Sequence, residues 1–309
     1  MAEETKRVVV IGLPHVGKTT FLAALWDVVG SGEVVGSLQL DRLEGDKHHL
    51  HEIRNRWADC LEIDRTKIPD ETLVSMRLKS THSQLVNEIV FTDMSGESFE
   101  QQWNERTCKR KYANIIKDAS GILLLIHPKR VKEAILISDA VKMSKVLEEP
   151  VAGTSKSTTS DTSATRAPSA KPLPTEPRYA ATQVQLVEML QFVRHLRPQR
   201  AKRLRLGIII SAWDVVETLA RKNAVPTPEA WFSERLALLE QYVRSNSEIY
   251  EHEVFGVSAQ GGELKDADTL RKCNPAGRIS VVHKGNRSND ITLPVRWVLN
   301  FVLESNAKS

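Results

Sequence analysis

Cysteine is scarce in this sequence, and long apolar runs are absent from it. The 309 residues include three cysteines, which lie far apart at Cys60, Cys108 and Cys273. This spacing matches neither a metal-binding motif nor a disulfide framework, so we expect free thiols in a reducing compartment. No apolar core follows Met1, and no run approaches the roughly 20 apolar residues that a membrane-spanning helix needs. These absences predict a cytoplasmic protein without a transmembrane segment.

A strong excess of charge of one sign is also absent. The chain has 43 Lys and Arg against 39 Asp and Glu, which gives a formal net charge of +4. A balance this mild permits an acidic partner but gives no reason to expect nucleic acid binding. The densest basic stretch, residues 197–205, is interpreted as a solvated helix end that leads into a strand. The hydrophobic fraction of 41% suits a globular protein with a substantial core.

The most specific motif begins directly after the apolar run Val8–Ile11. Residues 12–19 read GLPHVGKT and fit the phosphate-binding loop pattern G-x-x-x-x-G-K-[ST]. Its glycines let backbone N–H groups approach phosphate oxygens, and the helix that follows directs its positive end at the same anion. Lys18 supplies a mobile positive charge for the terminal phosphates, and the Thr19 hydroxyl can bind Mg²⁺. The chain is therefore expected to bind a nucleoside triphosphate. The residues assigned to this contact are Gly12, Leu13, Pro14, His15, Val16, Gly17, Lys18, Thr19 and Thr20.

Apolar, β-rich segments predict the strands. They are residues 7–11, 72–78, 85–92, 121–127, 204–210 and 253–257. The first, fourth and fifth are almost uniformly apolar, which is typical of parallel strands covered on both faces. Only a short polar stretch separates the second from the third, which predicts an antiparallel hairpin. We expect an α/β fold of the P-loop NTPase kind: a mostly parallel six-stranded sheet with one antiparallel hairpin strand and helices on both faces.

The connections between these strands contain the expected helices. They are residues 19–29, 41–63, 97–117, 129–147, 228–243 and 293–303. Residues 149–178 differ sharply, because they are almost all Ser, Thr, Ala, Pro and Lys without one aromatic residue. Such a segment cannot bury enough apolar surface to offset its ordering entropy. We therefore expect one domain over residues 1–309, interrupted by a disordered insert at 149–178.

Three shorter motifs follow the later strands. Residues 93–97 read DMSGE, residues 211–214 read SAWD, and residues 258–260 read SAQ. An Asp at a strand tip can bind Mg²⁺ through water, and a Gly three residues later lets a backbone N–H approach the γ-phosphate. Asp93 and Gly96 stand in these two positions.

In this order, GLPHVGKT, DMSGE, SAWD and SAQ resemble the motifs of the TRAFAC-class GTPases. The chain is most similar to the bacterial double-GTPase group found in multi-gene conflict or defence systems. The opening GLPHVGKTTFLAAL, the stretch DMSGESFE and the C-terminal RISVVH and NDITLPVRWVL support this subgroup. The resemblance spans nearly the whole chain apart from residues 149–178. It implies GTP binding and hydrolysis with Mg²⁺ in a switch-like role, with a protein partner as regulator or effector.

The resemblance also implies how a base would be read. Asp214 would accept two guanine N–H bonds, and residues Ser258, Ala259 and Gln260 would form the backbone-reading element that follows. The usual pattern [NT]-K-x-D is altered here, because Ser and Ala stand at positions 211 and 212. Trp213 is expected to replace part of the apolar contact that the missing Lys would make with the base. The altered motif leaves the preference for guanine over adenine open.

Metal binding and catalysis follow from the same resemblance. The expected Mg²⁺ ligands are Thr19, Thr66 and, through water, Asp93, with Thr72 as the alternative to Thr66. The expected catalytic residues are Lys18, Gly96 and Glu97. Glu97 stands where many small GTPases place a water-orienting Gln, and its carboxylate adds negative charge beside developing negative charge. We therefore expect slow hydrolysis, raised by a partner or by an arginine such as Arg106 or Arg110.

Two alternatives stay open from the sequence. One is a nucleotide-dependent interaction module without significant hydrolysis, which the absent Gln favours. The other is a P-loop ATPase or small-molecule kinase, against which the hairpin strand and the positions of Asp214 and Ser258 argue.

Overall fold

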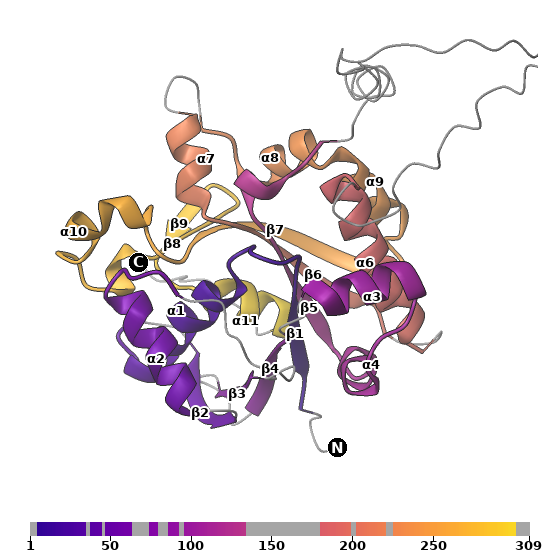
Figure 1. Ribbon diagram of the computed structural model, residues 1–309, viewed down its shortest axis with the longest axis horizontal. Helices are drawn as coiled ribbons and strands as arrows, with labels where there is room; N and C mark the ends of the chain where they lie inside the picture. Colours follow the sequence, from indigo (N-terminus) through magenta and orange to yellow (C-terminus); the bar gives the residue numbers. More distant parts are fainter. Residues whose placement is uncertain are drawn as a thin grey trace, which may run out of the picture.

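Strands with uniformly apolar sequences lie at the centre of one mixed sheet (Figure 1). The computed structural model describes residues 5–34, 38–44, 47–63, 74–79, 86–92, 96–133, 180–198, 202–220 and 225–300. Within these residues the sheet has nine strands in the order β2-β3-β4-β1-β5-β6-β7-β8-β9. Their bounds are β1 Arg7–Ile11, β2 Gln39–Glu44, β3 Val74–Lys79, β4 Val86–Phe91, β5 Gly121–Ile126, β6 Leu204–Ser211, β7 Tyr250–Ser258, β8 Ser280–His283 and β9 Asn286–Ser288.

The central strands are parallel and the outer strands are antiparallel. β1 pairs in parallel with β4 and β5, and β6 pairs in parallel with β5 and β7. β3 pairs antiparallel with β4, in a register that runs from Val74 opposite Phe91 to Lys79 opposite Val86. This register confirms the hairpin expected for the second and third predicted strands. β2, β8 and β9 extend the two edges of the sheet in antiparallel pairs.

Helices cover both faces of the sheet. The α-helices are α1 Lys18–Ser31, α2 Lys47–Ala58, α3 Gly96–Glu105, α4 Arg110–Lys117, α6 Thr182–Leu196, α7 Trp213–Leu219, α8 Pro228–Arg235, α9 Ala237–Ser245, α10 Ala267–Leu270 and α11 Leu293–Leu299. Short 3₁₀ helices are η1 Pro128–Arg130, η3 Leu264–Asp266 and η4 Ala276–Arg278. In Figure 1, α1, α2 and α11 lie on one side of the sheet, whereas α3, α4, α6 and α9 lie on the other. This arrangement explains why β1, β5 and β6 lack the alternation of a half-exposed strand, because both of their faces are buried.

The α/β class is confirmed, but the expectation of a mostly parallel six-stranded sheet is wrong. The sheet is mixed, and β2, β8 and β9 were missed. β8 and β9 form a tight hairpin whose two turn residues, Lys284 and Gly285, both have positive φ angles of 48° and 77°. Positive φ at both central residues is the geometry of the two-residue turns that fit the twist of a hairpin. Strands of four and three residues are too short to show an apolar alternation in the sequence.

Three predicted helices also need correction. Residues 41–63 contain the end of strand β2 as well as helix α2, so they do not form one helix. The pairing of β2 with β3 skips one residue between Leu40 and Arg42, and this bulge turns both Leu40 and Leu43 toward the same face. Leu43 lies seven residues before Leu50 of α2, so it fits the apolar period of that helix although it belongs to a strand. Residues 97–117 and 228–243 each divide into two helices, α3 with α4 and α8 with α9.

The predicted helix 129–147 and the predicted insert 149–178 lie almost wholly outside the described residues. The described chain stops at residue 133 and resumes at residue 180, and hydrogen bonds join these two points. The Thr182 backbone N–H donates to the Lys132 carbonyl at 3.1 Å, and the Lys132 N–H donates to the Thr182 hydroxyl oxygen at 2.9 Å. Within the described part of the chain, no helix combines the length and apolar character needed to cross a bilayer.

Candidate nucleotide-binding site

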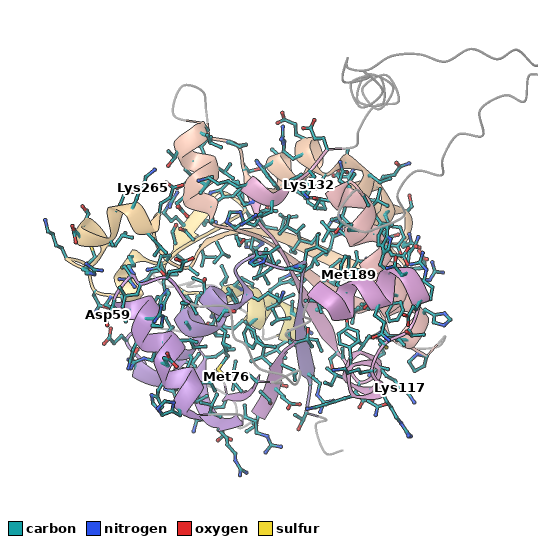
Figure 2. The ribbon with its side chains drawn as sticks, viewed as in Figure 1. Asp59, Met76, Lys117, Lys132, Met189 and Lys265 are labelled. Atoms are coloured by element: carbon teal, nitrogen blue, oxygen red, sulfur yellow. The ribbon has the colours of Figure 1, made fainter. Side chains whose placement is uncertain are left out.

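The predicted site residues that the structure describes gather at the carboxyl ends of the central strands, because parallel strands end on the same side of the sheet. β1 ends at Ile11, β5 at Ile126, β6 at Ser211 and β7 at Ser258. Figure 2 shows Lys132, shortly after the end of β5, above the central strands, and Lys117, which precedes β5, below them. The phosphate loop, the SAWD segment and the SAQ segment therefore lie at the same end of the central strands as Lys132.

Two glycines frame the phosphate loop for different physical reasons. A Cβ on Gly12 would lie 2.7 Å from the carbonyl oxygen of Leu125, so the loop can leave β1 this close to β5 only without a side chain. Gly17 has a φ of 89° and precedes α1 in the left-handed region, which glycine adopts at little cost. The start of the loop thus requires glycine because its backbone lies close to β5, and the end requires glycine because its φ angle is positive.

Some side chains of the loop are buried in the core, and others are exposed. Leu13 and Val16 are buried, at 9% and 4% exposure, and fix the loop to the core. His15 is exposed and has a φ of 61°, which is uncommon for a residue with a side chain. The loop therefore holds an irregular backbone path by packing two of its apolar side chains.

Lys18 is the first residue of α1, and its ammonium group folds back over the loop. Its Nζ donates to the carbonyl oxygens of Gly12 at 3.0 Å and Leu13 at 3.1 Å. Thr19 and Thr20 follow in the first turn of α1 and are half-buried. Lys18 and Thr19 therefore stand in the first turn of α1, at the positive end of the helix, where an anion would be stabilised.

The hydroxyl of Ser211 ties the phosphate loop to the sheet. Ser211 ends β6 and is 8% exposed, and its Oγ lies 2.7 Å from the Val16 carbonyl oxygen and 3.2 Å from that of Ile126. This short side chain therefore joins β6, β5 and the loop at one point. Position 211 is the first place where the sequence departs from [NT]-K-x-D, and the Ser found there still holds the loop.

Asp214 is held by the last residue of β7. The Ser258 hydroxyl donates a hydrogen bond to Asp214 Oδ1. Ala212, two residues before Asp214, adopts a left-handed conformation with φ 49° and ψ 51°, which costs a residue with a side chain roughly 1–2 kcal/mol. Strain of this kind concentrates where a fold must place a particular side chain. The structure thus brings Asp214 and Ser258 together, and their contact with a base stays a prediction.

Trp213 occupies a different place from the one expected. Its side chain is 1% exposed, and a Cβ on Gly256 of β7 would come within 2.5 Å of its ring. The indole therefore packs on the backbone of β7 as a core residue. The prediction that it replaces a lysine alongside the base finds no support in this position.

The metal and catalytic predictions are only partly covered by the described residues. Thr66, Thr72 and Asp93 lie outside them. Gly96 and Glu97 begin α3, and the structure describes only their backbone. Arg106 forms an ion pair with Glu188 of α6, and Arg110 is an exposed residue in the first turn of α4. Among the described residues, no group of three or more His, Cys, Asp or Glu side chains is arranged to hold a metal ion.

A cavity of about 340 Å³ adjoins the outer side of the phosphate loop, and the sequence analysis missed it. It is lined by residues that include Leu13, Pro14, Phe99, His127, Arg130 and Lys132. Burial is the largest cause that lowers the pKa of His127, followed by the charges of Arg130 and Lys129, while Asp214 opposes the shift. The His127 Nδ1 accepts a hydrogen bond from the Lys129 backbone N–H at 3.2 Å.

A signal for these residues existed in the sequence. Residues 127–130 read HPKR directly after the apolar strand GILLLI. A strand that pairs in parallel with β1 ends on the same side as β1, so the residues after it lie near the phosphate loop.

A loop framed by glycines between a central parallel strand and a helix, with a Lys folded over it, defines a P-loop nucleotide-binding protein. The match to known families is more specific. The chain belongs to the Double-GTPase 1 family, whose model matches residues 9–298. The comparison with curated proteins gave no match.

Solved structures of similar fold include two GTP- or GDP-bound proteins. One is the signal recognition particle receptor SRb-GTP/SRX complex from Chaetomium thermophilum, with 12% identity, a TM-score of 0.37, and coverage of 87% of this chain and 97% of that chain. The other is Sup35 complexed with GDP, with 11% identity, a TM-score of 0.33, and coverage of 85% of this chain and 39% of that chain.

Proposed function

We propose that this protein is a GTP-binding molecular switch that hydrolyses GTP slowly and acts with a protein partner in a bacterial conflict or defence system. The observation that carries the proposal is the junction at Ser211, where one hydroxyl joins the phosphate loop to the strand that leads to Asp214. Phosphate and base sites held by one strand form a single pocket for a nucleotide. Membership of the Double-GTPase 1 family supports guanine as the base.

In this proposal the chain provides positioning and charge, and no covalent catalysis is needed. The backbone of residues 12–19 and the Lys18 ammonium bind the phosphates, and Asp214 binds the base with help from Ser258. Thr19 suits Mg²⁺, because a hydroxyl in the first turn of α1 lies beside the phosphate-binding ammonium. Bound Mg²⁺ would neutralise charge on the β- and γ-phosphates. Thr66 and Asp93 are proposed to complete the metal site, and Gly96 to sense the γ-phosphate.

Slow hydrolysis follows from the proposed role of Glu97, because a carboxylate beside the γ-phosphate opposes the negative charge that develops there. Arg106 is paired with Glu188, so stimulation by this arginine would require that the pair open. A partner is therefore proposed to accelerate turnover. The second candidate, a binding module without hydrolysis, differs only in this step.

A titration with GTP, GDP and ATP in the presence of Mg²⁺ tests the proposal. We expect GTP and GDP to bind more tightly than ATP, and Lys18→Ala to abolish triphosphate binding. Tighter binding of ATP would instead favour a P-loop ATPase or kinase. Phosphate release by the wild type, by Glu97→Ala and by Lys18→Ala separates the first two candidates, since a pure binding module gives no release above the Lys18→Ala level.

A further inference from the structure

Buried hydrogen bonds join the end of helix α2 to the loop Ser258–Gln260. Trp57, in the last turn of α2, is fully buried, and its Nε1 donates to the carbonyl oxygen of Ala259 at 3.0 Å. Gln260 Nε2 donates in the opposite direction, to the Trp57 carbonyl oxygen at 3.2 Å. The two segments lie 202 residues apart in the sequence, so these bonds are tertiary contacts between separate parts of the fold.

Arg278 strengthens the same junction. It is 8% exposed, and it donates to the Trp57 carbonyl oxygen from Nη2 at 2.5 Å and to the Ala58 carbonyl oxygen from Nη1 at 3.0 Å. Its guanidinium carbon lies 4.9 Å from the centroid of the Trp57 ring. The last carbonyl groups of a helix have no partner within the helix, and a cation there also meets the negative end of the helix dipole. Arg278 therefore caps α2 and covers the indole that holds the loop.

Gly261 shows how closely the loop is seated on this junction. Its φ is +84°, and a Cβ at this position would lie 2.4 Å from the carbonyl oxygen of Arg278. The backbone of the loop thus rests directly on the backbone at Arg278, with no room for a side chain between them. We name the set of Trp57, Gln260 and Arg278 with these contacts the α2 clamp.

The α2 clamp acts on the residues proposed to read the base. Because a peptide unit is planar and trans, holding the Ala259 carbonyl also fixes the Gln260 N–H, which points away from Trp57. One residue earlier, Ser258 donates its hydroxyl hydrogen bond to Asp214. A continuous set of contacts therefore runs from the end of α2 to the carboxylate of Asp214.

Helix α2 is in turn fixed to the helix that follows the phosphate loop. The Arg54 Nε donates to Asp27 Oδ1 at 2.8 Å, and the side chain of Asp27, in α1, is 9% exposed. An ion pair that is buried on one side is screened less by solvent than a pair at the surface. Helix α2 thus contacts both the base-side loop and the phosphate-side helix.

We propose that Trp57 and Arg278 are positioning residues for base recognition, through which the end of α2 sets the selectivity for guanine and the lifetime of the bound nucleotide. This inference rests on the proposed function, because it assigns these residues a role at a guanine site. It adds to that function a structural element, helix α2, that would control nucleotide release without lining the phosphate loop.

The test measures the release of a fluorescent GDP analogue after mixing with excess unlabelled GDP. Trp57→Phe keeps an aromatic ring but removes the N–H, which leaves the buried Ala259 carbonyl without this donor. We expect release to be about 5- to 140-fold faster, the range for leaving one buried carbonyl without its donor. Gln260→Ala, which removes the reciprocal bond, should act in the same direction and serves as the second variant if Trp57→Phe folds poorly.

Arg271→Gln is the matched control. Arg271 Nε donates to the Asp59 carbonyl oxygen at 2.8 Å, one residue beyond the atoms that Arg278 caps, and Figure 2 places Asp59 beside α2 at the edge of the molecule. Because Arg271 donates to no carbonyl of Trp57 or Ala58, this variant should release the analogue within about twofold of the wild-type rate. Arg278→Gln removes the two bonds to the end of α2 and should accelerate release as Trp57→Phe does. Equal acceleration by Arg271→Gln would mean that only general stability is involved, and the inference would be wrong.

Base selectivity separates positioning from a structural effect. Inosine diphosphate lacks the exocyclic amino group of guanine, so the ratio of GDP to inosine diphosphate affinity reports the contact with Asp214. We expect this ratio to shrink in Trp57→Phe, whereas simple destabilisation would weaken both nucleotides equally. A wild-type protein that binds no GDP refutes the proposed function itself. Wild-type binding with an unchanged rate and ratio in Trp57→Phe refutes only the α2 clamp.

Discussion

Removal of one hydroxyl, in Ser211→Ala, should uncouple the phosphate loop from the sheet. The Ser211 Oγ is within hydrogen-bond distance of the carbonyl oxygens of Val16, at 2.7 Å, and Ile126, at 3.2 Å, and the side chain is 8% exposed. An alanine leaves both carbonyls short of this donor, at a cost of about 1–3 kcal/mol for a buried unsatisfied group. The Val16 carbonyl belongs to the phosphate loop, so the substitution should destabilise the loop conformation that binds phosphate.

If the whole cost appears in binding, we expect GTP affinity to fall by about 5- to 140-fold. If part of the cost appears in folding, we expect the free energy of unfolding to fall by about 1 kcal/mol or more. Titration with a fluorescent GTP analogue in Mg²⁺, together with urea unfolding, measures both quantities. Ser233→Ala is the control, because the Ser233 hydroxyl donates to Glu240 at 2.8 Å, between α8 and α9 and away from the loop. Wild-type GTP affinity in Ser211→Ala, or an equal loss in Ser233→Ala, would refute this account of the loop.

Two further predictions concern Asp214 and His127. Asp214→Asn should weaken GTP binding by at least about tenfold and improve the binding of xanthosine triphosphate. The reason is that the new amide can donate to the carbonyl that replaces the guanine amino group. An unchanged preference in competition binding would show that Asp214 is not part of the base site. The pKa of His127 lies below its ordinary value of 6.5 because of burial and of the charges of Arg130 and Lys129. Below about pH 6.5 the unfolded chain therefore binds a proton at this residue more readily than the folded chain does, which lowers the free energy of unfolding. The melting temperature of the wild type should therefore fall more between pH 7 and 5.5 than that of His127→Gln, and parallel pH profiles would contradict this. His252, whose pKa burial also lowers, is present in both proteins and leaves part of the slope in each.

The parts of the fold that the sequence predicts are those where local pattern and tertiary environment agree. The runs VVVI, ILLLI and LGIII are apolar because both faces of β1, β5 and β6 are covered, so their positions could be predicted to within a residue. Where local pattern and environment differ, the prediction is wrong. Leu43 of β2 fits the apolar period of the helix α2 that follows it, and the short edge strands β8 and β9 show no apolar alternation.

The candidate site divides in the same way. The positions of the phosphate loop, Asp214 and Ser258 could be predicted, because each lies at the carboxyl end of a parallel strand, whereas their contacts with a nucleotide stay predictions. The indole of Trp213 could not be placed, because the sequence does not show that Gly256 on a neighbouring strand leaves space for it in the core. The bond from Trp57 to Ala259 also could not be predicted, since it joins segments whose proximity only the complete fold determines.

The paired hydrogen bonds between Lys132 and Thr182 have an evolutionary consequence. They hold Lys132, shortly after β5, directly to Thr182, at the start of α6. The end of β5 and the start of α6 are therefore joined by contacts of their own as well as by the chain between them. A change in the length of that chain would leave these contacts in place, so we expect length variation between relatives to be tolerated at this point.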